Sequence, residues 1–199
     1  MDASKKPVRN ALIGVSLALA FGGGVLVAYL SSDGRLSYTE PHGNPSATAT
    51  SDLAAAPVAE RRAAPGFTFT DGDGRPMGLA DFKGRAVLVN LWATWCPPCI
   101  AEMPDLDALQ GKLGSERFQV VAISLDRGGP ETVKRWFGRN EIKNLKVYAA
   151  DPRQFENALL PTSLLLDAQG RVVWHGAGIR AWDGDQAESV IKALTAERE

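Results

Sequence analysis

The chain contains two cysteines, Cys96 and Cys99, and two prolines fill the positions between them. A cysteine pair at this spacing can form one disulfide, supply half of a metal site, or act as a redox couple. A structural zinc site needs four ligands, and the chain's two histidines, His42 and His175, lie far from the pair in sequence. We therefore expect no resident metal, and we predict thiol–disulfide exchange as the chemistry of the pair.

The segments on either side of the pair predict how it is positioned. Residues 86–93 form a run rich in valine and leucine, which is typical of a strand buried on both faces. Residues 100–113 carry helical periodicity, so Cys96 stands at a helix N-terminus, where roughly half a positive charge favours the thiolate. We predict that Cys96 is the nucleophile that forms a mixed disulfide with a target, and that Cys99 is the resolving thiol.

The first 64 residues differ in composition from the rest of the chain. Three basic residues, Lys5, Lys6 and Arg9, precede an uncharged run over residues 11–30. As a helix this run would span roughly 30 Å, the thickness of the hydrocarbon core of a bilayer. We predict a cytoplasmic segment over residues 1–10, a transmembrane anchor over 11–30, and the remainder of the chain outside. A cleaved signal peptide, with Ala18-Leu19-Ala20 as its cleavage site, is the alternative, and it also exports the chain.

Residues 31–64 are rich in small and polar residues, which predicts a flexible linker. Residues 65–199 are predicted to form one α/β domain with a mixed central sheet and helices on both faces. Its predicted strands are a hairpin over 67–78, then 86–93, 118–124, 145–149, 162–167 and 171–176. Its predicted helices are 100–113, one that begins at Pro130, a short one over 152–158, and one from about residue 183. The net charge of -1 gives no indication of nucleic-acid binding.

Two motifs resemble those of the thioredoxin superfamily, and the resemblance covers residues 65–199. Trp95-Cys96-Pro97-Pro98-Cys99 fits its W-C-x-x-C motif, and Leu160-Pro161-Thr162 resembles its cis-proline loop. The resemblance implies a thioredoxin-like fold, a redox-active Cys96–Cys99 disulfide, no cofactor, and a cis Pro161. It also implies that the Leu160 backbone is presented to an extended target peptide, which would bind by β-strand addition. The substrate-binding residues that it implies are Trp95, Pro97, Pro98, Leu160, Pro161 and Thr162.

The hairpin, the segment 125–150 and the single anchor resemble the TlpA/ResA branch, whose members are exported and usually reducing. Glu102 matches a glutamate near the active site of that branch, so we expect it to relay a proton to Cys99 with a pKa raised by burial. Asn90 stands where cytoplasmic thioredoxins keep a buried aspartate. The resemblance implies a monomer on the periplasmic side of a bacterial inner membrane, re-reduced by a membrane electron donor.

The target that the resemblance implies is a disulfide-containing exported protein, either an apocytochrome c or a copper-site protein. Dedicated cytochrome c maturation reductants carry a Gly-rich motif that ends in Pro-Glu at the cis-proline loop. In this chain the loop, residues 157–162, has no such motif, so both kinds of target remain open.

Two alternatives come from other functional classes. Peroxiredoxins place a threonine or serine three residues before their reactive cysteine, whereas this chain has Ala93 there. A Cu(I) delivery module could use the two thiolates of Cys96 and Cys99, because soft ligands select Cu(I). No methionine or histidine neighbours the pair, so a partner would have to supply further ligands. Outside the motif, we expect Trp92 in the core and His175 in solvent.

Overall fold

The computed structural model describes residues 17–21, 24–30, 36–39 and 53–197. The chain divides into two compact units, residues 1–48 and residues 49–199. In the first unit, the strands β1 (Leu17–Phe21), β2 (Gly24–Leu30) and β3 (Leu36–Thr39) pair in that order as an antiparallel sheet.

The described part of the predicted anchor is therefore strand, not helix. Among the residues that the structure describes, no helix is long and apolar enough to cross a membrane. The predicted cytoplasmic segment, residues 1–10, lies outside the described residues.

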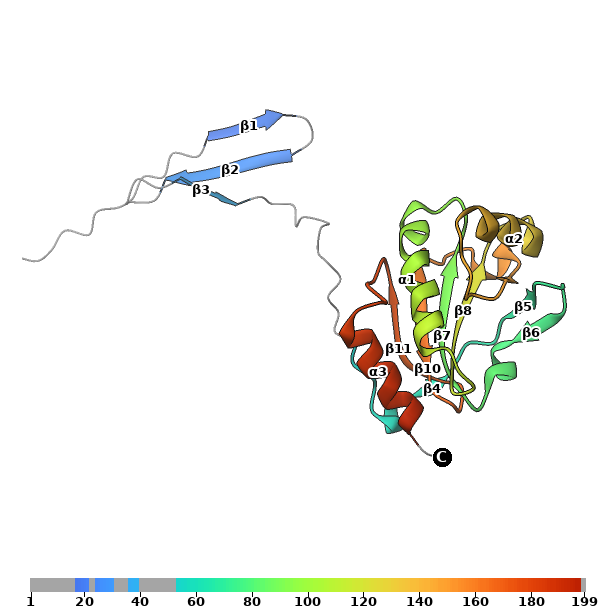
Figure 1. Ribbon diagram of the computed structural model, residues 1–199. Coiled ribbons are helices and arrows are strands. Elements are labelled where there is room, and N and C mark those ends of the chain that lie inside the picture. The colour runs from blue at the N-terminus through green and yellow to red at the C-terminus, as the bar shows by residue number, and fades with distance from the viewer. Residues whose placement is uncertain (1–16, 22–23, 31–35, 40–52, 198–199) are drawn as a thin grey trace, which may run out of the picture. The chain divides into compact units, whose positions relative to one another are not determined.

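The second unit contains one mixed eight-stranded sheet, in the order β4-β11-β10-β7-β8-β9-β5-β6 (Figure 1). β8 pairs in parallel with β7 and β9, and the other neighbours are antiparallel. The strands are β4 (Arg62–Ala63), β5 (Thr68–Asp71), β6 (Pro76–Gly78), β7 (Ala86–Trp92), β8 (Phe118–Ser124), β9 (Tyr148–Ala149), β10 (Thr162–Leu166) and β11 (Arg171–Ala177). The helices are η1 (Val58–Glu60), η2 (Leu79–Phe82), α1 (Pro97–Leu113), α2 (Gly129–Arg139), η3 (Pro152–Phe155) and α3 (Asp185–Ala196).

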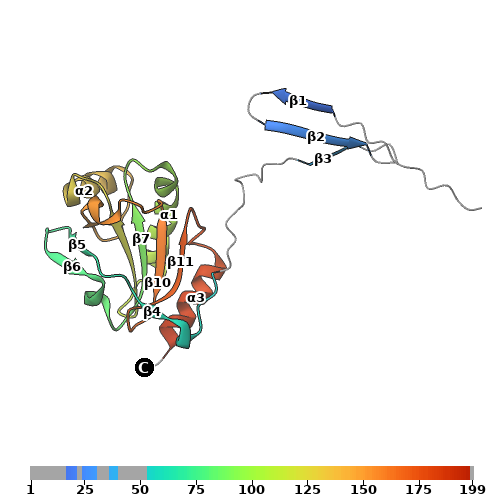
Figure 2. The ribbon, with the colours of Figure 1, turned by 180° about the vertical axis from the view of Figure 1, so that it is seen from behind.

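The central strand β7 divides the core into two clusters. Its side chains alternate, so Leu88 and Trp92 pack with the buried side chains of α1, α2 and α3, while Val87 and Val89 belong to the opposite cluster. In Figure 1, α1 and α3 lie in front of the sheet, and Figure 2 shows the molecule from behind. The second cluster includes side chains of η2 and η3 but none of an α-helix. The expected helices on both faces are thus α-helices on one face and short 3₁₀ helices on the other.

The predicted helices and strands of the domain are present, and two of them are shorter than predicted. Every residue of β7 is buried, as the apolar run predicts, and the hairpin is formed by β5 and β6. The strand predicted over 145–149 is reduced to Tyr148–Ala149, and the short helix over 152–158 is the 3₁₀ helix Pro152–Phe155. α1 continues through Pro104 as a single helix.

The compact unit begins earlier than the predicted boundary at residue 65. Leu53 is buried, and the Ala56 amide donates a hydrogen bond to the carbonyl of Val173 at 2.9 Å. Arg61 reaches the buried Asp167 with an Nη1–Oδ2 distance of 3.2 Å. Because a buried carboxylate requires charged or hydrogen-bonding partners, part of the segment assigned to the linker belongs to the structure of the domain.

Candidate active site

The turn between β7 and α1 carries the cysteine pair, and a buried carboxylate holds this turn. Asp126, just after β8, accepts hydrogen bonds from the Thr94 backbone amide at 2.9 Å and from the Thr94 hydroxyl at 2.7 Å. The hydroxyl of Ser124 also donates to this carboxylate at 2.7 Å. These three bonds fix the turn to the end of the neighbouring strand, so Cys96 is positioned by β8 as well as by β7.

Cys96 and Cys99 form a disulfide at the N-terminus of α1. Cys96 is the N-cap, and its sulfur accepts a hydrogen bond from the Cys99 amide at 3.3 Å. Pro97 and Pro98 have no amide hydrogen, so the Cys99 amide is the first donor of the helix that can reach this sulfur. This donor and the helix dipole both favour negative charge on the Cys96 sulfur.

The peptide bond between Leu160 and Pro161 is cis, as predicted. Pro161 is buried and immediately precedes β10, and its carbonyl accepts a hydrogen bond from the Gly178 amide at 2.8 Å. The Thr162 hydroxyl donates to the carbonyl of Leu159. The cis-proline loop is thus tied both internally and to the segment that follows β11.

Glu102 lies on α1 three residues after Cys99, which places the two side chains as neighbours on the helix surface. Glu102 is 1% exposed. Its Oε1 accepts from Asn90 Nδ2 at 2.6 Å, and its Oε2 accepts from the Arg180 backbone amide at 3.3 Å. Burial raises the pKa of Glu102 to about 7, and the contacts with Asn90, Arg180 and Trp182 oppose the rise. The carboxyl is therefore able to gain or lose a proton near neutral pH.

Asn90 orients this carboxyl through its amide group. Its Nδ2 donates both to Glu102 and, at 3.0 Å, to the hydroxyl of Ser163 on β10. All three side chains are buried. An amide at this position supplies hydrogen to the carboxylate without adding a second negative charge.

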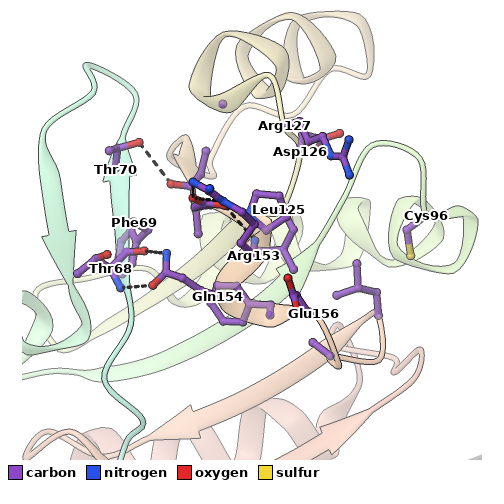
Figure 3. A pocket seen from close by; sticks show the side chains of 18 of the residues that line it. Thr68, Phe69, Thr70, Cys96, Leu125, Asp126, Arg127, Arg153, Gln154 and Glu156 are labelled. Carbon is purple, nitrogen blue, oxygen red and sulfur yellow. Dashed lines mark hydrogen bonds and ion pairs between the residues drawn. The ribbon is translucent and has the colours of Figure 1, made fainter.

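A groove of about 1130 Å³ begins at Cys96 and extends to β5 (Figure 3). Its lining includes the apolar side chains of Phe69 and Leu125 and the basic side chains of Arg127 and Arg153. Arg153 is paired with Asp151, and this pairing lowers the pKa of Asp151 to about 2. Cys96 lines the groove, whereas Cys99 does not and is fully buried.

Three of the six predicted substrate-binding residues line this groove, whereas Pro161 and Thr162 are not among its lining residues. Trp95 is 66% exposed and lines it together with Pro97 and Leu160, while Pro98 is exposed but lies outside its lining. Trp92 is buried and His175 is exposed, as expected. The sequence prediction missed Asp126, Ser163 and Arg180, which reach the site from distant segments and carry no motif.

A buried strand that delivers a helix-capping cysteine pair, with a cis-proline loop tied beside it, defines a thiol–disulfide oxidoreductase of the thioredoxin fold. Comparison with known proteins agrees with this class. Residues 59–193 match the Redoxin family, and the chain belongs to this family.

Similar proteins include the thiol-disulfide oxidoreductase ResA of Bacillus thuringiensis subsp. konkukian, which is 32% identical over an alignment of 142 positions; the match covers 66% of this chain and 76% of the relative. ResA of Bacillus subtilis is 31% identical over an alignment of 138 positions, and that match covers 67% of this chain and 73% of the relative. Among solved structures, a thiol:disulfide interchange protein of the thioredoxin family from Chlorobium tepidum is similar with a TM-score of 0.55 and 30% identity. That match covers 68% of this chain and 97% of the other.

Proposed function

We propose that this protein reduces a disulfide in an exported target protein, with Cys96 as the nucleophile. The observation that carries the proposal is the unequal access to the two sulfurs. Both cysteines are largely buried, but Cys96 is 5% exposed, lines the groove and caps α1, whereas Cys99 is 0% exposed and does not line it. A target disulfide that enters the groove therefore meets Cys96 first.

The reaction balances over two thiol–disulfide exchanges. In the reduced protein, the Cys96 thiolate attacks one sulfur of the target disulfide, so a Cys96–target disulfide forms and the other target sulfur leaves as a thiolate. The Cys99 thiol then loses its proton and attacks the Cys96 sulfur, which releases the second target thiolate. The target gains two electrons and two protons, and the protein is left with the Cys96–Cys99 disulfide.

Glu102 is proposed to accept the proton of Cys99 in the second step. A general base works best when its pKa lies near the operating pH, and burial raises the pKa of Glu102 to about 7. The hydrogen bond from Asn90 at 2.6 Å fixes the orientation of the carboxyl.

Trp95 and Leu159 are proposed to bind the target beside the reacting sulfur. Both are large apolar side chains that are more than half exposed, at 66% and 73%. Large exposed aromatic and aliphatic side chains beside a groove are typical of binding surfaces. An extended peptide would lie across Leu160, as the resemblance to the thioredoxin superfamily implies.

We further propose that residues 11–30 export and anchor the domain at the outer face of a bacterial inner membrane. The basic residues before this run and its length support that proposal. The reducing direction, a membrane electron donor that restores the dithiol, and an apocytochrome c or copper-site protein as target are drawn from the resemblance to the TlpA/ResA branch.

Trapping of the mixed disulfide tests this function. A Cys99→Ser variant of the full chain cannot resolve the intermediate, so we expect it to accumulate a target protein in a disulfide that dithiothreitol releases. The matched Cys96→Ser variant retains the buried thiol and should accumulate none. Equal trapping by the two variants would refute the assignment of the nucleophile, and absence of trapping by Cys99→Ser would refute the reaction.

A further inference from the structure

The segment between β11 and α3 contacts two parts of the active site through its backbone. The Gly178 amide donates to the carbonyl of the cis-proline, Pro161, at 2.8 Å. Two residues later, the Arg180 amide donates to Oε2 of Glu102 at 3.3 Å. Residues 178–180 therefore link the cis-proline loop to the buried carboxyl, and their conformation determines whether both bonds form.

The Arg180 side chain holds this segment against two tryptophans. Its Cζ lies 4.4 Å from the centroid of the Trp174 ring and 5.9 Å from that of Trp182. A guanidinium within about 6 Å of an indole centroid is attracted by the negative face of the ring. The two indoles meet edge to face, with centroids 6.0 Å apart, and Trp182 is fully buried. We call Trp174, Arg180 and Trp182 the arginine clamp.

A glycine in β11 makes room for the clamp. Gly176 follows Trp174 by two residues, so both face the same side of the strand. A Cβ atom at Gly176 would lie 2.6 Å from two carbons of the Trp174 ring, which is closer than any real contact. The indole therefore lies along the strand only because residue 176 has no side chain.

We propose that Arg180 is a positioning residue, and that the arginine clamp holds residues 178–180 so that their backbone binds both the cis-proline loop and the proton-accepting carboxylate. The inference rests on the proposed function, because it assigns a role to Arg180 in the step that uses Glu102. Without the clamp, the ionised carboxylate loses an oriented amide donor. The carboxyl then holds its proton to a higher pH, and the second exchange slows at neutral pH.

The charged groups near Glu102 come from two elements. α1 contributes Asp105, and the segment after β11 contributes Arg180, together with Asp183, which acts on Asp105. Burial raises the pKa of Asp105, and the charge of Asp183 adds to the rise. β7 and β10 present uncharged side chains to the carboxyl or to its amide partner. Arg180 is thus the cationic side chain on the described elements that interacts with this carboxyl, and its removal acts in the same direction as the loss of the amide donor.

The reaction of the reduced full-length protein with Ellman's reagent tests the proposal. Attack by Cys96 releases one thionitrobenzoate, and resolution by Cys99 releases a second, so the pH dependence of the second phase reports Glu102. We expect Arg180→Ala and Trp174→Leu to raise the midpoint of this phase by about one pH unit, a ten-fold slower second phase below the midpoint. Arg180→Lys keeps a cation over the ring, so its midpoint should lie close to that of the native protein.

Two further variants control the experiment. Arg135→Ala removes an exposed arginine on α2 and should leave the midpoint unchanged. Gly176→Ala displaces the Trp174 ring without removing any of the three clamp residues, and should also raise the midpoint. Amide hydrogen exchange of residues 178–182, measured on the oxidised full chain, should become faster in Arg180→Ala, Trp174→Leu and Gly176→Ala and stay slow in Arg135→Ala.

The outcomes separate this inference from the proposed function. An unchanged midpoint and unchanged exchange in both Arg180→Ala and Trp174→Leu would overturn the clamp while the reaction itself stands. If the second phase of Glu102→Gln keeps the pH midpoint of the native protein, the role of Glu102 is refuted, and the inference with it. If Arg180→Ala fails to fold, Arg180→Gln and Gly176→Ala provide the same comparison.

Discussion

At the scale of single residues, the proposed chemistry depends on a buried carboxyl group, Glu102, which lies three residues after Cys99 on the same helix. Glu102 is surrounded by neutral donors, and one of its oxygens lies 2.6 Å from Asn90 Nδ2. This arrangement tolerates the ionised form without stabilising it fully, so burial still raises the pKa to about 7. A carboxyl with this property is useful to a thiol that must lose a proton near neutral pH.

Replacement of Glu102 by glutamine should slow the resolving step at pH 7 by about 100-fold, because a general base typically contributes a factor of this order. The second phase of the reaction with Ellman's reagent measures this rate. The first phase, attack by Cys96, should change little because the helix N-terminus supports that thiolate. A loss confined to the first phase would contradict the assignment.

The same variant should change how stability depends on pH. Folded Glu102 holds its proton up to about pH 7, whereas the unfolded group releases it near its ordinary value of 4.5. The folded state therefore binds more protons between these values, and the free energy of unfolding falls as pH rises through this window. The loss attributable to Glu102 is about 3 kcal/mol. Urea unfolding from pH 4 to 8 should show this fall in the native protein, relative to Glu102→Gln. A parallel dependence in the two proteins would disprove the raised pKa.

Asn90→Asp should raise the pH at which Glu102 loses its proton, whereas the neutral amide of Asn90 lowers it. A second carboxyl within hydrogen-bonding distance of Glu102 disfavours ionisation of both, so the pair retains one proton to a pH above 7. The midpoint of the second phase should rise, and its rate at pH 7 should fall by about ten-fold. Asn90→Ala serves as the control that removes the amide without adding charge. An identical pH profile for Asn90→Asp and Asn90→Ala would contradict this electrostatic account.

Some of these residues could be predicted from the sequence and others could not. Cys96, Cys99, Pro161 and Glu102 stand at fixed spacing within recognisable motifs, so local pattern was sufficient. Arg180 approaches Glu102 across 78 residues of chain, and its contact exists only after β11 and α1 are packed. No local pattern in a single sequence specifies such a pairing.

At the scale of elements, the turn that holds the cysteines is attached to β8 through Asp126. This carboxylate accepts both polar hydrogens of Thr94 and the hydroxyl of Ser124. It is buried, so its loss would leave the Thr94 amide without this partner. The position of Cys96 thus depends on a strand that contributes no residue to the chemistry.

Asp126→Ala should destabilise the protein by about 3 kcal/mol, since hydrogen bonds to a charged group contribute about 1.5–3 kcal/mol and a buried unsatisfied donor adds a further cost. Denaturant unfolding measures this change. Asp73→Ala, at a side chain that is 80% exposed, should stay within about 0.5 kcal/mol of the native protein. Equal effects at the two positions would contradict the role of Asp126 in holding the turn.

The elements themselves were predicted with differing success for physical reasons. β7, β8 and α1 carry long apolar patterns, and their predicted positions agree closely with the structure. β9 is only two residues long, because Tyr148 and Ala149 are the residues of the predicted strand that pair with β5 and β8. The prediction over 11–30 rests on length and hydrophobicity, which valine- and leucine-rich strands share with helices, and the structure describes residues 17–21 and 24–30 of this run as strand.

At the scale of the whole molecule, the segment before the predicted domain boundary contributes to stability. Leu53 is buried, β4 pairs with β11, and Arg61 bonds to both Asp167 and Glu197. A chain that begins at residue 65 lacks all of these contacts. Composition alone suggested a linker, because it does not reveal that one leucine and one arginine in this segment find buried partners.

A chain that begins at residue 65 should therefore be less stable than one that begins at residue 49, by about 3 kcal/mol. Burial of one leucine contributes about 2 kcal/mol, and hydrogen bonds to a charged group add about 1.5–3 kcal/mol, offset by the entropy of ordering the segment. Arg61→Ala in the longer chain should account for roughly half of the difference. Equal unfolding midpoints for the two chains would show that the segment contributes nothing.

The reduction potential of the Cys96–Cys99 pair tests the central claim most directly. It would be measured by equilibration of the protein with a glutathione or dithiothreitol redox buffer at pH 7. A protein that reduces target disulfides should have a value well below about -200 mV, close to that of thioredoxin. A value near about -120 mV, typical of strong oxidants, would contradict the account and assign the protein to disulfide formation instead.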